Sequence, residues 1–376
     1  MSSPTTEHTP AVRPTLANRV REYAAGSGTI WILGALVALV IAFTVLAPTT
    51  FASAYNVRSL FTDAAILLVL GVGMTFVIIT AGIDLSVGSV LVFSGVVSAQ
   101  VMSAFGGTEA GLLGVFAGLL VALLSGVAWG ALNGVLIGVF GIPPLIVTLG
   151  TFGAALGLAK VLTNGVDDRN VPTILADTIG TGTIGGIPWL VIIAMVVTVL
   201  GALLLGLTRF GRHTKAIGSN AEGARRVGVA VKPQLIKVYA LAGLLAGLGG
   251  FLSLARFSTT TIAGHTTDNL TVIAAVVLGG TSLFGGIGSV VGTAIGVFIP
   301  AVLQNGFVIL GIQPFWQEFA VGVVLILAVF FDQYRRRARS KGASRRGKHP
   351  APPRATESLG AAPPAPAGAK ERINNG

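Results

Sequence analysis

Residues 66–80 read ILLVLGVGMTFVIIT, and residues 81–90, which follow directly, read AGIDLSVGSV. A second apolar run, LVFSGVVSA, begins at residue 91. Apolar runs of this kind predict helices that cross a membrane. Asp84 stands between the two runs, where a carboxylate is costly unless it is solvated, paired or used as a cap. The glycines and serines around it predict a break in the helical backbone between two spans.

Composition extends this interpretation to the whole chain. Of 376 residues, 53% are hydrophobic and only 10% are charged, and the mean hydropathy is +0.83. An ordinary soluble domain carries about 25% charged residues. The 52 glycines fit the close packing of membrane helices. We therefore predict an all-α, polytopic membrane protein with about ten transmembrane helices, some of them broken or re-entrant.

The predicted spans follow the apolar runs. They are 30–47, 60–80, 87–105, 111–138, 144–163, 187–207, 235–256, 270–283, 288–311 and 315–331. The run at 270–283 is short for a full crossing and ends in LGGTSLFGGIGS. Because glycine weakens helices, this run is predicted to be broken or re-entrant.

The distribution of basic residues predicts how the chain is oriented in the membrane. The net charge is +11, and most of the 25 Lys and Arg fall in residues 1–29, 208–237 and 332–376. With ten spans, all three segments lie on one face, and basic segments beside spans mark the cytoplasmic side. The connection 164–186, with three aspartates, then lies outside. Both termini are expected in the cytoplasm, and the charge predicts no nucleic-acid binding.

The ends of the chain differ in composition from the middle. Residues 1–29 are predicted to be a flexible cytoplasmic tail, and residues 30–331 a transmembrane domain, which the family resemblance given below makes a permease domain. Residues 332–376 are basic and then Pro/Ala-rich, which predicts a disordered cytoplasmic tail whose basic block touches anionic lipid.

The sequence offers no enzyme chemistry. It has no cysteine, no HExxH metal motif and no set of nucleophile, base and acid. Residues 342–348, GASRRGK, have the spacing of a phosphate-binding loop, but His349 follows where Ser or Thr would hold magnesium. We interpret the match as chance, so no catalytic residue, metal or cofactor is predicted in this chain.

The most informative polar stretch is 209–237, RFGRHTKAIGSNAEGARRVGVAVKPQLIK. Asn220 can cap a helix through AEGARRVG, with Glu222 in its first turn and Gly228 at its end. Local chemistry leaves two interpretations open. One is a positive-inside loop with a short surface helix, and the other is a helix that docks into a cytoplasmic partner.

A family resemblance favours docking. AIGSNAEGARRVGV (216–229) resembles the coupling segment of the permease subunits of ATP-binding-cassette sugar importers of the ribose, xylose and galactose type. AGIDLSVGSV is similar to that family's GGIDLSVGS. GALNGVLIG (130–138), VTLGT (147–151), TVIAAVVLGGTSLFGGIGSVVGT (271–293) and LQNGFVILGI (303–312) are also similar. The resemblance covers roughly residues 57–332, in the same order.

The resemblance implies a division of labour. Two permease copies, as a homodimer or pseudo-dimer, form the path. A separate ATP-binding subunit carries ATP and magnesium, and a soluble sugar-binding protein delivers cargo from outside. The cytoplasmic coupling segment is 208–234. Its residues expected to couple to the ATPase are Gly218, Asn220, Glu222, Ala224, Arg225 and Gly228.

The chain also departs from the family pattern. Gly223 precedes Ala224 where the family has paired alanines, and Leu156 stands where it often has an arginine. Asn269 and Thr271 occupy places that are often acidic. These differences leave the cargo open.

Polar residues within the spans are the candidates for a translocation path or gate: Asp84, Ser86, Ser89, Asn133, Thr148, Thr151, Gln304 and Asn305. Hydroxyl and amide groups suit a polyhydroxylated solute, although amides in membrane helices often bind a neighbouring helix instead. For Asp84, a structural cap, a gate and a proton relay are open. A relay needs more intramembrane carboxylates than this chain offers.

The prediction is a permease subunit of the inner (plasma) membrane that imports a sugar or similar polyol by ATP-driven alternating access. One alternative is a branched-chain amino-acid permease of the same superfamily. Another is a secondary carrier that needs no ATPase. A membrane enzyme would need a catalytic constellation that the chain lacks.

Overall fold

The structure, a computed structural model, describes residues 28–313 and, beyond them, scattered helical positions between 315 and 330. The predicted N-terminal tail, apart from residues 28 and 29, and the predicted tail 332–376 lie outside the described residues. The last predicted span, 315–331, is described only at the scattered positions.

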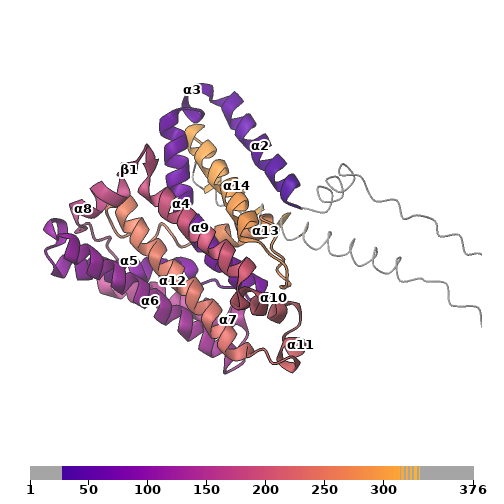
Figure 1. Ribbon diagram of the computed structural model, residues 1–376. Coiled ribbons are helices and arrows are strands. Elements are labelled where there is room, and N and C mark those ends of the chain that lie inside the picture. The colour runs from indigo at the N-terminus through magenta and orange to yellow at the C-terminus, as the bar shows by residue number, and fades with distance from the viewer. Residues whose placement is uncertain are drawn as a thin grey trace, which may run out of the picture. The chain divides into compact units, whose positions relative to one another are not determined.

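The described part of the chain is dominated by helices (Figure 1). The long helices are α2 (Gly28–Leu46), α4 (Ala54–Ile79), α5 (Val87–Ala104), α6 (Leu112–Gly138), α7 (Pro144–Thr163), α9 (Trp189–Leu207), α12 (Val231–Phe257) and α14 (Val290–Ile309). The shorter helices are α3 (Pro48–Phe51), η1 (Gly107–Glu109), α8 (Thr173–Leu175), η2 (Ala176–Gly180), α10 (Arg209–Ser219), α11 (Ala221–Arg226) and α13 (Asp268–Leu278). Strands β1 (Thr183–Ile184) and β2 (Ile187–Pro188) form one short antiparallel pair.

Seven of the described helices are long and apolar enough to cross a membrane, namely α4, α5, α6, α7, α9, α12 and α14. Residues 32–46 of α2 and all of α13 are shorter apolar helices. The predicted all-α, polytopic architecture is thus confirmed. Two helices begin well before the predicted spans. α4 begins at Ala54 and not at 60, and α12 begins at Val231, so residues 231–234 of the predicted coupling segment form the first turn of a span.

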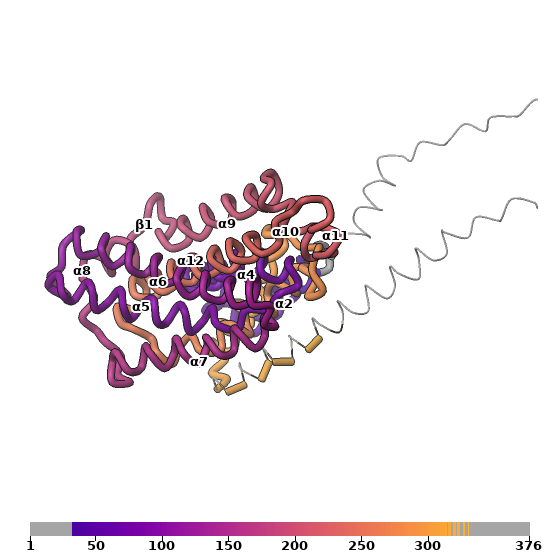
Figure 2. Tube along the Cα trace, turned by 90° about the horizontal axis from the view of Figure 1, so that it is seen from below, coloured from indigo at the N-terminus to yellow at the C-terminus, as the bar shows by residue number. Residues whose placement is uncertain are grey.

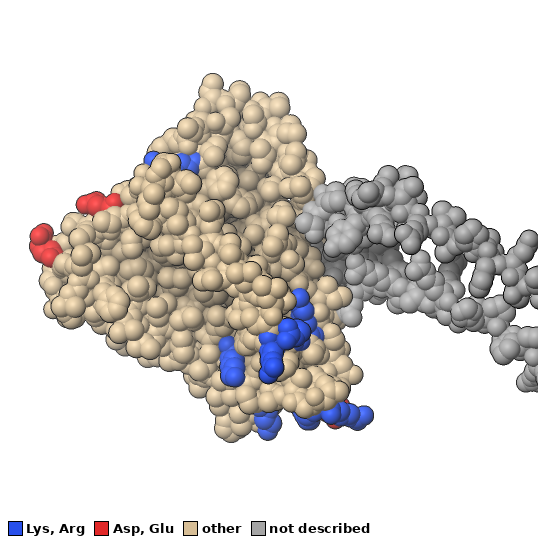
Figure 3. Space-filling view, viewed as in Figure 1, with Lys and Arg blue, Asp and Glu red and all other residues tan. Residues whose placement is uncertain are grey.

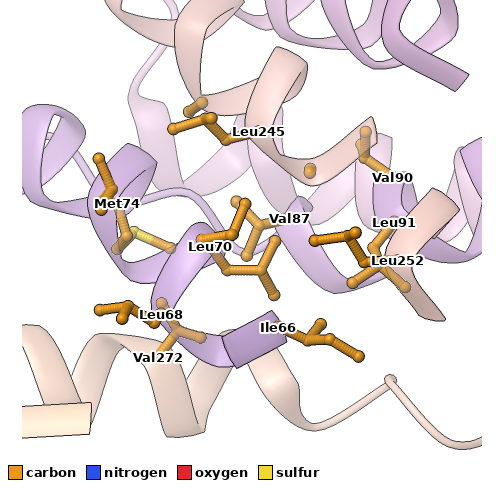
Figure 4. Close-up of a cluster of buried hydrophobic side chains, with 14 of the residues drawn as sticks. Ile66, Leu68, Leu70, Met74, Val87, Val90, Leu91, Leu245, Leu252 and Val272 are labelled. Atoms are coloured by element: carbon orange, nitrogen blue, oxygen red, sulfur yellow. The ribbon is translucent and has the colours of Figure 1, made fainter. Parts of the chain in front are cut away.

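The core lies where α4, α5 and α12 meet. Most of α4 and α12 is buried inside the bundle, whereas a much smaller share of α6, α7 and α9 is buried. Figure 2 shows α9 and α7 on opposite sides, with α4 and α12 between them. Figure 4 shows Leu70 of α4 packed near Leu91 of α5 within this core. Apolar side chains that pack this closely fix the position of each helix along its neighbours.

Glycine lets α6 and α12 pack closely. A Cβ at Gly130 of α6 would collide with the backbone carbonyl of Tyr239 in α12, and one at Gly126 would collide with that of Gly243. Small residues permit this close approach between membrane helices. This glycine-lined contact between α6 and α12, here called the glycine seam, brings Asn133 close to the turn of α12 that carries Tyr239. Asn133 lies one turn beyond Gly130.

Two helices begin inside the bundle instead of at its ends. α5 follows the irregular segment 80–86, here called the break, and α13 follows the irregular segment 258–267. The start of α13 meets the break, because Asn269 donates from Nδ2 to the carbonyl oxygen of Leu85 at 3.0 Å. The predicted short, broken run at 270–283 is therefore a half-length helix.

The chain after α12 turns back into the bundle. His265 returns to the level of Ser253 of α12, and the two side chains lie 2.8 Å apart between Nε2 and Oγ. The carbonyl oxygen of His265 also lies against Gly88 in the first turn of α5, where a Cβ would collide with it. This return places two helix N-termini, those of α5 and α13, side by side in the interior.

Charge marks one end of the bundle. Lys and Arg gather over α10, α11 and the start of α12, and a smaller basic spot lies near α4 and β1 (Figure 3). Acidic patches in the same view lie near α8, at the end away from α10 and α11. We call the end that holds α10 and α11 the basic end.

Candidate functional site

The segment that is predicted to couple to an ATPase contains two capped helices at the basic end. Thr208 caps α10 by accepting a hydrogen bond from the Gly211 amide at 3.2 Å. Asn220 caps α11, because its Oδ1 accepts from the Gly223 amide at 2.8 Å. Gly228 follows α11 with φ of +86°, a conformation that favours glycine. The capped helix predicted from the sequence is present.

α10 is seated on the end of α4. Gly218 packs so closely against the Ile79 carbonyl and the Gly286 amide that a Cβ would collide with both. The Gly286 amide itself donates to the Ile79 carbonyl at 2.8 Å. Three segments therefore meet at Gly218: α10, the last residue of α4 and the irregular stretch before α14.

The coupling segment is also fixed to α12. Gln234 donates from Nε2 to the Phe210 carbonyl and to the Thr214 hydroxyl, both at 3.0 Å. Ala224 is buried in a small cluster with Ile217 and Val231. Contacts at Gly218, Ala224 and Gln234 therefore join α10 and α11 to α4 and α12.

The outer face of α11 is free of other described helices. Glu222 pairs with Arg225 at 3.1 Å and with Arg226 at 3.5 Å, and its side chain is 59% exposed. Val227, which is apolar, is 80% exposed. A charged, exposed face with an apolar residue at its edge is chemically suited to a protein partner.

The break gathers most of the predicted path residues. Asp84 is 2% exposed, and its Oδ1 accepts from the amide of Ser86 at 2.8 Å and from the hydroxyl of Ser86 at 2.6 Å. The Ser89 hydroxyl donates to the Ser86 carbonyl at 2.9 Å. Asp84 therefore holds the turn just before α5, whose N-cap residue, Ser86, makes no side-chain capping bond.

Neighbouring helices close around the break. Asn133 of α6 donates from Nδ2 to the Ser86 hydroxyl at 2.9 Å. Thr148 of α7 donates to the Ile83 carbonyl at 3.3 Å. Thr151 lies one turn further along α7 and bonds within its own helix, to the Val147 carbonyl.

Gln304 and Asn305 do not belong to this cluster. Asn305 of α14 exchanges two amide hydrogen bonds with Asn56 of α4, each at 2.9 Å. Asn56 lies 23 residues before Ile79 on the same helix, which corresponds to roughly 35 Å. The amide pair joins two helices, as amides in membrane helices often do, and it lies far from Asp84.

Sequence reasoning missed two features, one beside the break and one at the start of α13. Tyr239 of α12 lies against Gly82. His265 bonds through Nδ1 to Asp268 at 2.7 Å and through Nε2 to Ser253. The available signals were a hydroxyl inside an otherwise apolar span and a His–Asp pair three residues apart.

Comparison with known proteins gives a consistent assignment. Residues 56–329 match the family described as branched-chain amino acid transport system / permease component. The chain is 38% identical to the ribose import permease protein RbsC of Escherichia coli (strain K12), over 79% of this chain and 91% of that protein.

Two further relatives agree. The D-allose transport system permease protein AlsC of Escherichia coli (strain K12) is 34% identical, over 81% of this chain and 91% of that protein. The fructose import permease protein FrcC of Rhizobium meliloti is 33% identical, over 86% and 90%. No solved structure matches the chain. From the matched residues, the capped coupling segment and the apolar helical bundle, the chain belongs to the family of transport-system permease components, and it is a transport subunit, not an enzyme.

Proposed function

We propose that this chain is the permease subunit of an ATP-driven importer that moves a sugar or a similar polyol across the cytoplasmic membrane by alternating access. The observation that carries the proposal is the contact between Gly218 of α10 and Ile79, the last helical residue before the break. Movement of α10 and α11 by an ATPase therefore acts directly on the segment that holds Asp84. The family match supports the same function.

The chemistry around the break favours a neutral cargo. Its buried polar side chains are mainly hydroxyls and amides, from Ser86, Asn133, Thr148 and Asn269. Such groups suit the hydroxyls of a sugar, whereas a zwitterionic amino acid calls for charges of both signs. The relatives described as ribose, allose and fructose permeases point the same way.

Uptake by intact cells tests the function. A strain that lacks this chain should lose uptake of one labelled pentose or hexose and regain it when the chain is restored. Uptake should fall when cellular ATP is depleted and should survive a protonophore for as long as ATP is maintained. Restored leucine uptake without sugar uptake would favour the amino-acid alternative. Sugar uptake that persists without ATP would identify a secondary carrier.

The proposed partners occupy different surfaces. The ATP-binding subunit meets the outer face of α11 at the basic end, which faces the cytoplasm by the positive-inside rule. The sugar-binding protein meets the opposite end, where a cavity of about 250 Å³ is lined in part by Arg58 and Arg256. Exposed apolar faces of α6 and α9 contact lipid.

A second copy of the chain is proposed to pack on α7. Gly150, Gly153 and Gly157 lie on the exposed side of this helix, and a Cβ at any of them would meet nothing within 4 Å. Gly153 and Gly157 form a GxxxG pattern, which lets two membrane helices approach closely.

Cysteine crosslinking tests the α7 contact directly, because the chain has no cysteine of its own. Ala154→Cys, which lies between Gly150 and Gly157 on the same side, should form disulfide-linked dimers in oxidised membranes. Val199→Cys on α9, at a side chain that is 57% exposed, serves as the control and should stay monomeric. Dimers that form through Val199→Cys and not through Ala154→Cys would place the contact elsewhere.

A further inference from the structure

The carboxylate of Asp84 is buried without a basic partner. It is 2% exposed, and the salt bridges among the described residues do not include it. Its hydrogen bonds both reach Oδ1, and both come from Ser86. Burying a charged group without a counter-charge is costly, so a carboxylate in such a place needs compensation.

Two more buried polar side chains reach the same segment, and each carries an oxygen atom without a partner. Asn133 and Tyr239 are 0% exposed, and Asn133 Oδ1 and the Tyr239 hydroxyl have no hydrogen-bond partner. The Asn133 amide is held on the break through its bond to Ser86. The Tyr239 hydroxyl lies 2.5 Å from the position that a Cβ on Gly82 would occupy. Buried polar atoms are almost always paired, so these two call for a ligand.

The three groups define the chemistry of that ligand. They are a carboxylate from the break, an amide oxygen from α6 and a phenol oxygen from α12. The set contains oxygen only, which selects a hard cation. A single carboxylate supplies one negative charge, whereas calcium and magnesium sites in proteins usually carry more carboxylates or phosphates. In the part of the chain that the structure describes, no group of three or more His, Cys, Asp or Glu could hold a metal ion.

We propose that Asp84, Asn133 and Tyr239 bind one monovalent alkali cation, with Na⁺ as the probe ion. A buried water would pair the amide and the hydroxyl but would leave the charge of the carboxylate unbalanced. The cation balances the charge and pairs both oxygens. It also ties α6 and α12 to the start of α5, so it stabilises the arrangement of the break. The site stands on this geometry alone and does not depend on which cargo the chain moves.

Thermal unfolding of the purified full chain tests the site. NaCl is exchanged for choline chloride at constant ionic strength. Because a ligand that binds only the folded state raises its stability by mass action, the wild-type Tm should rise saturably by a few degrees with Na⁺. A saturable response to K⁺ in place of Na⁺ supports the same site.

Variants separate a ligand from a structural contact. Asp84→Asn should remove the response to cations while leaving the Tm in choline no lower than that of the wild type. Tyr239→Phe deletes a hydroxyl that has no protein partner, so its Tm in choline should match the wild type. Its apparent affinity for Na⁺ should be about tenfold lower, which corresponds to the loss of one modest ligand. Tyr55→Phe, at a tyrosine that is 84% exposed, is the matched control and should respond as the wild type does.

Two results would overturn the proposal. One is a wild-type Tm that is the same in Na⁺, K⁺, Li⁺ and choline. The other is an undiminished response in Asp84→Asn, which would show that the cation acts elsewhere. An Asp84→Asn variant that is more stable than the wild type, with no ion dependence in either protein, would identify a protonated carboxyl instead.

Discussion

Glu222→Lys should reduce ATP-driven uptake roughly ten- to hundredfold, the range expected when a coupling free energy between two sites is lost. Glu222 is the acidic residue in the first turn of α11, where it pairs with Arg225 and Arg226. A lysine there places three cations on one short helix and opposes the helix dipole. The charge of residue 222, on the surface that would meet the ATPase, therefore changes from negative to positive.

The same change should leave the fold intact. The Glu222 side chain is 59% exposed, and substitutions of this kind alter stability by less than about 1 kcal/mol. Membrane content and Tm should therefore match the wild type. Glu109→Lys reverses an exposed charge in η1, at the other end of the bundle, and should transport normally. Unchanged uptake by Glu222→Lys would remove α11 from the coupling surface.

Gly218→Leu should abolish transport by separating α10 from α4. The first carbon of the side chain already collides with the Ile79 carbonyl and the Gly286 amide. Both obstacles are backbone atoms, which cannot rotate away as a side chain can. Overpacking of this kind costs about 1–3 kcal/mol or more, so α10 should detach from the end of α4 while the membrane-spanning helices remain packed.

Limited trypsin digestion would detect that displacement. Cleavage after Arg225 and Arg226 should be roughly tenfold faster or more in Gly218→Leu, because each 1.4 kcal/mol of lost docking raises the open population tenfold. Gly206→Leu is the matched control, since Gly206 is exposed and has nothing within 4 Å of its Cβ position. Equal cleavage in the two variants would show that α10 is not held through Gly218.

Much of the fold could be predicted because the signals are local. The apolar runs predicted the described spans in order, and glycine content predicted that the 270–283 run is incomplete. Asn220, Glu222 and Gly228 predicted a short capped helix, since a cap acts within one turn of its own chain. The hydrogen bonds from Ser86 to Asp84 in the turn before α5 have the same local character.

The contacts between helices could not be predicted, because they depend on which turns of different helices lie at the same depth in the bundle. Asn305 and Asn133 carry the same side chain in similar surroundings, yet one pairs with Asn56 and the other faces the break. The glycine seam between α6 and α12 sets the height of Asn133 and Tyr239, and a single sequence does not encode that register visibly. The return of 258–267 into the interior was missed for a related reason. The return is stabilised by contacts with Ser253 and Gly88. Both residues are distant in sequence from the glycine-rich stretch between α13 and α14, where the sequence predicted an interruption.

The most direct test of the central claim is site-specific crosslinking in native membranes. A photoreactive benzoylphenylalanine is placed at Val227, 80% exposed beside α11, and in a second strain at Tyr55, 84% exposed at the start of α4. We expect a crosslinked adduct from position 227 with one separate nucleotide-binding chain, identified by mass spectrometry, and no such adduct from position 55. A nucleotide-binding chain captured from position 55, or absent from position 227 while uptake is intact, would contradict coupling through α11.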